Sequence, residues 1–339
     1  MCRMQEQPSQ HPAPQTGETD ARRLEAARGW AAQKLGLPGV SLLPVSGDAS
    51  FRRYFRVRAG ARTLILMDAP PELENSSAFV DIAGRLRRAG LHAPEIIDFD
   101  LQAGFGLLED LGDELYRERV SPETAGQLFP TLFTMLSRMA GSVDASGLPP
   151  YDHQRLQAEL DLFTEWYLTR HRKRPLAGEE IPAWKQLCTE LKRSAAEQPQ
   201  VFVHRDFHSC NLLYLPGEDP GLIDFQDAVC GPVSYDFISL LWDRYISWPR
   251  SRLEEWMEAY RQLLGLDVQA EQWRRWCDLM GLQRNLKIVG IFSRLHHRDG
   301  KPGYLEMIPR FYRYLLDVMP RYPEFHETCR LLEQAECAP

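Results

Sequence analysis

The sequence lacks the features that mark several common functional classes. Its seven cysteines are scattered without a C-x-x-C pair, so neither a disulfide framework nor a zinc site is indicated. No apolar run approaches the length of a bilayer span, no signal peptide opens the chain, and the G-x-S-x-G motif of serine hydrolases is missing. A net charge of −7 disfavours a nucleic-acid partner, which would require a basic surface. We therefore expect a cytoplasmic protein with neither a nucleic-acid nor a membrane partner.

Apolar residues, in contrast, are abundant enough for two separate cores. The chain has 339 residues, of which 44% are hydrophobic. Its first 20 residues are polar and rich in Gln and Pro, a composition typical of a disordered tail. Strand-like alternation begins near Val40 and returns up to Glu109, interrupted by a helical pattern over residues 76–88, and helical periodicity prevails from Pro122 onward. These patterns predict a β-rich N-terminal part and a mainly helical C-terminal part.

Two short apolar runs end in acidic and amide side chains. The first, V-F-V-H-R-D-F-H-S-C-N, covers residues 201–211, and the second, G-L-I-D-F-Q-D, covers residues 221–227. Each is typical of a strand that leads into a loop, and another apolar run with a Pro-Gly turn separates them. We expect these strands to present Asp206, Asn211 and Asp224 at one edge.

Phosphoryl transfer from ATP requires this set of side chains. One carboxylate accepts the proton of the acceptor hydroxyl, while an amide and a second carboxylate hold magnesium on the phosphates. Asp206 precedes Asn211 by five residues, as the catalytic Asp precedes the Asn in the kinase signature. The alternative, that Asp206 and Asp224 only cap turns, does not explain the matched spacing, order and strand context. We predict Asp206 as the base, and Asn211 and Asp224 as metal ligands.

The motifs resemble those of a known family. H-x-D-x-x-x-x-N followed by I-D-F is similar to the aminoglycoside phosphotransferase-like kinases, which phosphorylate small molecules. Three further segments resemble the bacterial anomeric kinases of N-acetylmuramate and N-acetylglucosamine that act in cell-wall recycling. They are G-D-A-S-F-R-R-Y-F-R-V at residues 47–57, M-D-A-P-P-E at residues 67–72 and R-D-G-K at residues 298–301. The resemblance covers roughly residues 25–325.

This resemblance implies an α+β, two-lobed protein-kinase-like fold that uses ATP and Mg2+. A β-rich N-lobe over residues 21–110 would bind the nucleotide, and a mainly helical C-lobe over residues 111–339 would carry the catalytic loop and the acceptor site. The connector between the lobes would bind adenine through the backbone of Glu109, Asp110 and Leu111.

Two residues are expected to support the catalytic loop rather than to react. Asp236 matches the Asp of the family that braces the loop, and it stands at the first turn of an expected helix. The helix dipole alone also favours an Asp at this place, which leaves a second explanation open. His204 opens the H-R-D segment and is expected to have a structural role as well.

The segment between the first two expected strands resembles a phosphate-binding loop. It reads S-G-D-A-S and consists of Ser46, Gly47, Asp48, Ala49 and Ser50. A Gly with small polar neighbours between strands is where a kinase-like fold lays backbone amides over the ATP phosphates. A simple hairpin turn would be the alternative, but the catalytic motifs downstream favour the phosphate loop.

The Lys that holds the α- and β-phosphates in protein kinases has no counterpart. No Lys occurs between Gly36 and Leu108, and the third expected strand reads T-L-I-L-M-D-A-P. The helix that follows lacks the partner Glu. Arg52 and Arg53 are the nearest cations. Because neighbouring residues of a strand face opposite sides, only one of the two can reach the nucleotide.

Basic residues are frequent in the expected helix over residues 270–295 and just after it. Four of them fall in one stripe at about 100° per residue, namely Arg284, Lys287, Arg294 and Arg298. A stripe facing the acceptor suits the carboxylate of N-acetylmuramate and not a polycationic aminoglycoside. The alternative is that the stripe is a solvated helix face without a role in binding. We predict an ATP-dependent sugar 1-kinase. A kinase for choline, homoserine or an aminoglycoside, and a nucleotide-binding pseudokinase, remain alternatives.

Overall fold

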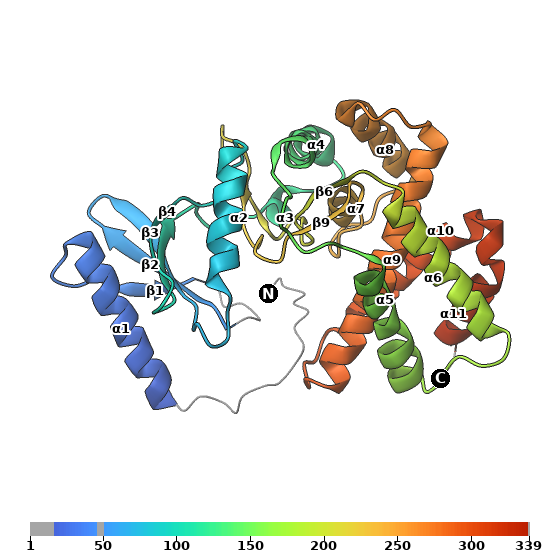
Figure 1. The fold of residues 1–339 in the computed structure, drawn as a ribbon, viewed down its shortest axis with the longest axis horizontal. Coiled ribbons are helices and arrows are strands. Elements are labelled where there is room, and N and C mark those ends of the chain that lie inside the picture. Colours follow the sequence, from blue (N-terminus) through green and yellow to red (C-terminus); the bar gives the residue numbers. More distant parts are fainter. Residues whose placement is uncertain (1–16, 46–50, 338–339) are drawn as a thin grey trace. The chain divides into compact units, whose positions relative to one another are not determined.

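The computed structural model describes residues 17–45 and 51–337, whose elements are labelled in Figure 1. The chain forms two compact units, which we call unit 1 and unit 2. Unit 1 combines the residues up to Val120 with Ser209–Asp227, and unit 2 combines Ser121–His208 with the residues from Ala228 onward. The lobe boundary expected at residue 110 stays a prediction. Residues 1–16 of the expected tail lie outside the described ranges, and residues 17–20 are helical rather than part of a tail.

Unit 1 is built on a five-stranded antiparallel sheet in the order β1-β2-β3-β5-β4. The strands are β1 (Leu42–Pro44), β2 (Arg53–Ala59), β3 (Arg62–Asp68), β4 (Ile96–Asp100) and β5 (Phe105–Glu109). Helix α1 (Gly17–Leu35) covers one face of this sheet. Its Trp30 belongs to the same hydrophobic cluster as Val57 of β2 and Leu107 of β5, which buries this face.

Helix α2 (Ser76–Arg88) packs on the other face of the sheet (Figure 1). Its Phe79 contacts Phe99 of β4, with ring centroids 6.3 Å apart. Gly106 of β5 is paired with Phe99, and a Cβ at this glycine would come within 2.5 Å of the Phe99 ring. The missing side chain therefore makes room for the aromatic contact that seats α2 on the sheet.

Residues 209–227 join unit 1 as a second hairpin, in which β7 (Leu212–Leu213) pairs with β8 (Gly221–Leu222). Both strands were predicted from their apolar runs and are confirmed. The N–H of Leu222 donates to the carbonyl oxygen of His92 over 2.9 Å, and Phe225 stacks on Phe79 at 5.0 Å. The short helix α3 (Tyr116–Arg119) contacts β7. The hairpin is thus fixed to unit 1 from both sides.

Unit 2 is mainly helical. Its elements are α4 (Ala125–Ser142), α5 (His153–Leu162), the π-helix η1 (Phe163–His171), α6 (Glu180–Ala196), β6 (Gln200–Val203), β9 (Val229–Pro232), α7 (Tyr235–Leu241), α8 (Arg250–Leu264), α9 (Ala270–His297), η2 (Leu305–Met307), α10 (Ile308–Val318), η3 (Met319–Arg321), η4 (Pro323–Phe325) and α11 (His326–Cys337). Helix α9 is central, since α5, η1, α6, α7, α8 and α10 all contact it. Every residue of α9 from 276 to 293 is buried. The sheet of unit 1 and the helices of unit 2 confirm the predicted α+β class.

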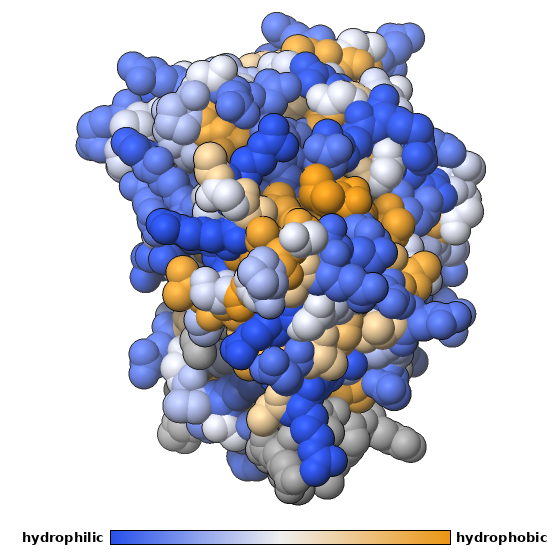
Figure 2. Space-filling model, turned by 90° about the vertical axis from the view of Figure 1, so that its left-hand side faces the viewer, coloured by the Kyte–Doolittle hydropathy of each residue, from blue (hydrophilic) through white to orange (hydrophobic). Residues whose placement is uncertain are grey.

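On one face of the molecule, the apolar part of the surface is divided into small groups. On the face drawn in Figure 2, apolar residues occur in separate groups surrounded by polar ones. Single exposed apolar side chains are normal for folded proteins. Within residues 17–45 and 51–337, no helix combines the length and the apolar character needed to cross a bilayer.

Helix α9 approaches Trp242, which directly follows α7, at Gly281. A Cβ at this position would come within 2.0 Å of the ring of Trp242, which is fully buried. The same ring stacks on Tyr314 of α10, with centroids 5.3 Å apart and planes only 3° from parallel. Trp242 is therefore held between two helices and has no space to yield.

We expect Gly281→Ala to destabilise the fold. The added methyl group would force Trp242 out of its position, and such overpacking lowers the unfolding free energy by about 1–3 kcal/mol. Gly126 of α4 is a matched control, because nothing lies within 4 Å of a Cβ built there. Gly126→Ala should be neutral or gain up to about 1 kcal/mol from helix propensity. Urea unfolding of both variants measures the difference, and equal stabilities would contradict the packing argument.

Candidate active site

The two predicted metal ligands lie together in unit 1. Asn211 precedes β7 and Asp224 follows β8, so the hairpin brings them to the same end. The amide nitrogen of Asn211 donates to Asp224 Oδ2 over 3.2 Å, and the side chains are almost completely buried. Gln226 donates to the other carboxylate oxygen, Oδ1, over 2.7 Å. These contacts fix the Asp224 carboxylate from both of its oxygens.

The backbone of Asp224 is in an uncommon conformation. Its φ of 68° lies in the left-handed region, which only a few per cent of residues other than Gly adopt, although Asp does so more often than most. The N–H of the preceding Ile223 donates to the carbonyl oxygen of Asn211 over 3.1 Å, which closes the end of the hairpin. Strained residues of this kind occur preferentially at functional sites.

The oxygen donors of this pair fit a hard cation. Mg2+ prefers carboxylate and amide oxygens and binds through one or two carboxylates together with substrate phosphates. Because the nitrogen of Asn211 faces Asp224, its amide oxygen is the atom suited to ligate. The described residues contain no group of three His, Cys, Asp or Glu side chains arranged around a metal. The pair therefore suits a cation that the nucleotide phosphates help to hold.

Asp206 lies in unit 2, in a segment braced by Asp236 of α7. The N–H of His204 donates to Asp236 Oδ2 over 2.6 Å, and the N–H of Arg205 donates to Oδ1 over 3.0 Å. Arg205 has a φ of 76°, so a strained residue directly precedes Asp206. The N–H of Asp206 donates to Nδ1 of His204 over 3.2 Å. Asp236 thus accepts two backbone N–H groups of the segment, and His204 accepts the N–H of Asp206; their structural role stays a prediction.

A buried carboxylate that the sequence did not single out holds the same segment. Glu159 of α5 is 2% exposed and pairs with Arg205 at 3.1 Å and with Lys287 at 3.3 Å. It also accepts hydrogen bonds from Gln283, over 2.9 Å, and from the hydroxyl of Tyr151. Removing one partner of a buried, hydrogen-bonded charge network is strongly destabilising. Glu159 therefore ties the loop before Asp206 to α5 and α9.

Burial shifts the ionisation of the bracing carboxylate. It raises the pKa of Asp236 from 3.8 to about 7, although the N–H bonds from His204 and Arg205 favour the charged form. Between pH 3.8 and about pH 7, Asp236 of the folded chain holds a proton that the unfolded chain releases. Its contribution to stability is therefore complete below pH 3.8 and is lost as the pH rises through about 7.

We expect this loss to disappear when Asp236 is replaced. Within the window, each pH unit changes the unfolding free energy by up to about 1.4 kcal/mol. Between about pH 5 and about pH 7, wild-type stability should fall more steeply than that of Asp236→Asn. Urea unfolding of both proteins at several pH values provides the comparison. Parallel curves would show that Asp236 has an ordinary pKa in the folded chain.

The predicted nucleotide-binding residues are only partly described. Ser46, Gly47, Asp48, Ala49 and Ser50 all lie outside the described ranges.

The two arginines that follow differ in their partners. Arg52 is 4% exposed and pairs with Glu74 at 2.7 Å, and Glu74 also accepts the N–H of Phe51 over 3.2 Å. Arg53 pairs with Asp68 at 2.6 Å, and Arg23 reaches the same carboxylate at 2.7 Å. The two guanidinium groups are therefore engaged by different carboxylates.

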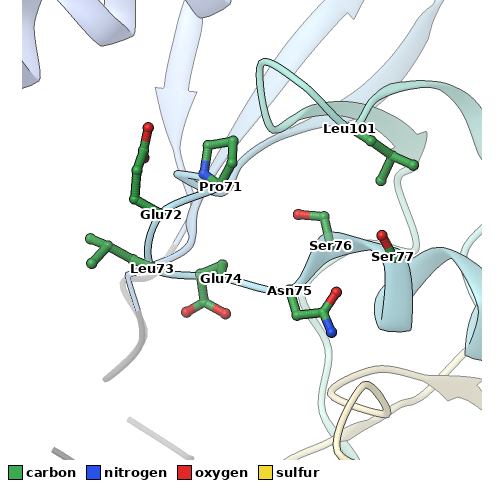
Figure 3. Close-up of a pocket in the computed structure, with 8 residues that line it drawn as sticks. All are labelled: Pro71, Glu72, Leu73, Glu74, Asn75, Ser76, Ser77 and Leu101. Atoms are coloured by element: carbon green, nitrogen blue, oxygen red, sulfur yellow. The ribbon is translucent and has the colours of Figure 1, made fainter.

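The sequence did not indicate Glu74 as the partner of a phosphate-binding cation, because Glu74 precedes α2 and the family pattern places that Glu within the helix. It stands in a loop that curves around a pocket of about 420 Å³, lined by residues 71–77 and by Leu101 (Figure 3). Of the residues that line it, Glu74 contacts a predicted site residue, Arg52. We assign it no role.

The expected connector is held by charged contacts within unit 1. Asp110 pairs with Arg56 of β2 at 2.6 Å, and Arg56 also pairs with Asp113 at 2.7 Å. The N–H of Glu109 donates to the carbonyl oxygen of Glu95 over 2.8 Å, and Leu111 is 8% exposed. Arg56 therefore anchors Asp110, and Arg87 pairs with the neighbouring Glu109 at 3.4 Å, so two arginines hold the segment that is predicted to meet adenine.

The four predicted acceptor cations have different surroundings in unit 2. Lys287 is buried with Glu159 and with the hydroxyl of Tyr235, which lies 3.2 Å from its Nζ. Arg298 is exposed and pairs with Asp299 at 2.7 Å. Arg294 is half-buried, and Arg284 is buried. The stripe is therefore not a uniform solvated face.

Comparison with known proteins identifies the family. The model of the phosphotransferase enzyme family matches residues 41–279. The N-acetylmuramate/N-acetylglucosamine kinase of Pseudomonas aeruginosa is 46% identical over 316 residues, 91% of this chain and 91% of that protein. The protein of the same name from Pseudomonas putida is 41% identical and covers 88% of this chain and 90% of its own.

The likeness extends to solved structures. ADP-bound aminoglycoside phosphotransferase APH(2'')-Ib matches with a TM-score of 0.57 and 14% identity, over 87% of this chain and 97% of that one. This match confirms the predicted protein-kinase-like fold. The sequence relationships and the family model agree with it, and the chain belongs to the phosphotransferase enzyme family.

Proposed function

We propose that the protein is an ATP- and Mg2+-dependent kinase that phosphorylates the anomeric hydroxyl of N-acetylmuramate and N-acetylglucosamine in peptidoglycan recycling. The observation that carries this proposal is the 46% identity to the N-acetylmuramate/N-acetylglucosamine kinase of Pseudomonas aeruginosa, over 91% of both chains. Membership of the phosphotransferase enzyme family supports the reaction type. The order Asp206, Asn211, Asp224 supports an active enzyme rather than a pseudokinase.

Asp206 is the general base in this proposal. It orients the anomeric hydroxyl of the sugar and accepts its proton as the oxygen attacks the γ-phosphorus of ATP. The bond between the γ-phosphorus and the bridging oxygen breaks, and ADP leaves. The hydrogen bonds of Asp236 and the ion pair of Glu159 support this role, because they hold the strained segment in front of Asp206.

Asn211 and Asp224 would hold the metal ion in this proposal. Mg2+ supplies charge neutralisation for the phosphates when it is bound with ATP. The hydrogen bond between the two side chains and the contact from Gln226 keep the Asp224 carboxylate oriented before the nucleotide arrives.

Arg52 is our choice for the cation that replaces the missing strand Lys. Glu74 holds its guanidinium and also the N–H of Phe51, directly after the predicted phosphate loop. In protein kinases, a Glu holds the Lys that binds the nucleotide phosphates. The Arg52–Glu74 pair has the same two charges, but its residues stand at different positions in the chain. Arg53 instead contributes to a network with Asp68 and Arg23. Residues 109–111 are proposed to meet adenine through their backbone.

A turnover assay across acceptors tests the proposed function. ADP release is measured with N-acetylmuramate, N-acetylglucosamine, choline, homoserine and an aminoglycoside, each with and without Mg2+. We expect magnesium-dependent turnover with the two amino sugars only. Turnover with choline, homoserine or the aminoglycoside instead would assign the protein to another branch of the family. No turnover with any acceptor would favour a pseudokinase.

A further inference from the structure

Arg284 of α9 is a buried cation with few partners. The residue is 3% exposed. Within the described part of the chain, its guanidinium donates one hydrogen bond, from Nη1 to the carbonyl oxygen of Trp242 over 3.5 Å. Its Nε is buried and has no hydrogen-bond partner among the described residues. A guanidinium carries five N–H donors, and leaving them unpaired away from water is unfavourable.

Arg284 lies among charges of both signs. Burial lowers the pKa of Arg284, and the positive charge of Arg244 acts in the same direction, while Asp206 and Asp243 oppose both. Arg284 and Arg244 also help burial to lower the pKa of His208 well below its ordinary value. Arg284 therefore interacts electrostatically with the proposed base.

Lys287 lies one turn after Arg284 on α9 and differs from it in having a counter-ion. It too is buried, but it has Glu159 as a counter-ion at 3.3 Å and a hydroxyl at 3.2 Å. No ion pair joins Arg284 to a carboxylate anywhere in the described ranges. A buried guanidinium that forms no ion pair with a carboxylate of the protein is suited to pairing with a carboxylate on a ligand.

We propose that Arg284 binds the anionic group of the acceptor and sets the preference for N-acetylmuramate over N-acetylglucosamine. The proposal rests on the proposed function, because it takes the acceptor hydroxyl to lie at Asp206. Asp206 is itself only 7% exposed, so a neighbouring binding group need not lie on the surface. The lactyl carboxylate offers two oxygens to the forked N–H groups of a guanidinium. N-Acetylglucosamine has no such group.

The burial of Arg284 also has a consequence for stability. Replacing a buried charge by an apolar side chain of similar volume is often neutral or stabilising when its pairing is poor. An arginine that only supports the fold would show the opposite, since its removal would lower stability. Arg284→Met should therefore melt no lower than the wild type while it loses recognition of the anionic sugar.

Kinetics and thermal shifts on Arg284→Met test the proposal. We expect kcat/KM for N-acetylmuramate to fall about 10- to 100-fold, while kcat/KM for N-acetylglucosamine stays near the wild-type value. N-Acetylmuramate without ATP should raise the melting temperature of the wild type but not of the variant. Arg284→Lys keeps the charge without the fork and should lose less selectivity than the methionine variant.

Arg275→Met is the matched control. It removes the same charge from the same helix, at a position where the guanidinium pairs with Glu324 at 2.7 Å. This variant should keep the wild-type preference between the two sugars. Equal losses on both sugars in Arg284→Met, or a selective loss in Arg294→Met or Arg298→Met instead, would overturn the assignment of Arg284.

The outcomes separate this proposal from the proposed function. Failure of the wild type to phosphorylate either sugar would refute the function. Turnover of both sugars with an unchanged preference in Arg284→Met would leave the function standing and refute only the role of Arg284. A melting temperature well below that of the wild type, with both sugars affected alike, would identify Arg284 as a structural residue.

Discussion

Asp206→Asn should bind ATP nearly as well as the wild type yet turn over about 10²–10⁴-fold more slowly, the usual contribution of a general base. The amide keeps the size and the hydrogen-bonding reach of the carboxylate, but it cannot accept the proton of the sugar hydroxyl. The bracing contacts of Asp236 involve the backbone of His204 and Arg205, so they should survive the substitution. Steady-state turnover and calorimetric titration with ATP measure the two effects separately.

Two results would contradict the assignment of Asp206. Turnover near the wild-type rate would remove it from the reaction. A loss of ATP affinity as large as the loss of turnover would mean that the variant is misfolded or that Asp206 serves the nucleotide rather than the acceptor.

Asp224→Ala should lose the dependence of nucleotide binding on magnesium altogether. This carboxylate is buried with Asn211 and is fixed by Gln226, and its removal leaves the amide of Asn211 as the remaining predicted metal ligand. ATP titrations with and without Mg2+ should then give the same weak affinity, and turnover should fall below detection.

Asp227→Ala is the control for this variant. Asp227 belongs to the same motif and is half-buried, but its contact from Gln226 is long, at 3.4 Å. We expect it to retain the gain in nucleotide affinity on adding Mg2+. Retention of that gain in Asp224→Ala would exclude Asp224 as a metal ligand.

The parts of the site that lie close together in the sequence could be predicted from it. Asn211 and Asp224 flank one short hairpin, and two apolar runs with a Pro-Gly turn between them are enough to indicate such a hairpin. Asp236 follows Asp224 on the next helix and was recognised from the family resemblance. These residues depend on local structure, which propensity and turn chemistry largely decide.

Contacts between distant segments could not be predicted. Glu159 precedes Arg205 by 46 residues, and an acid on a helix is usually a solvated residue. Nothing in the composition of α5 indicates that this one is buried among cations. Glu74 likewise precedes the helix in which the family pattern places a Glu. Both were missed because their role is defined by tertiary packing.

The basic stripe on α9 shows the limit of helical periodicity. The 3.6-residue period placed four cations on one face, but it could not distinguish a solvated face from a buried one. In the structure the stretch from residue 276 to 293 is buried all round, and the helix packs against α5, η1, α6, α7, α8, η2 and α10. Lys287 therefore meets Glu159, whereas Arg284 meets a backbone carbonyl.

Identification of the phosphorylated position tests the central claim most directly. The protein is incubated with Mg2+, ATP and either N-acetylmuramate or N-acetylglucosamine, and the product is examined by phosphorus–proton correlation NMR. The account predicts a new sugar phosphate whose phosphorus couples to the anomeric proton, formed in step with ADP and absent with Asp206→Asn. Phosphate attached at another hydroxyl, or ADP accompanied only by inorganic phosphate, would contradict it.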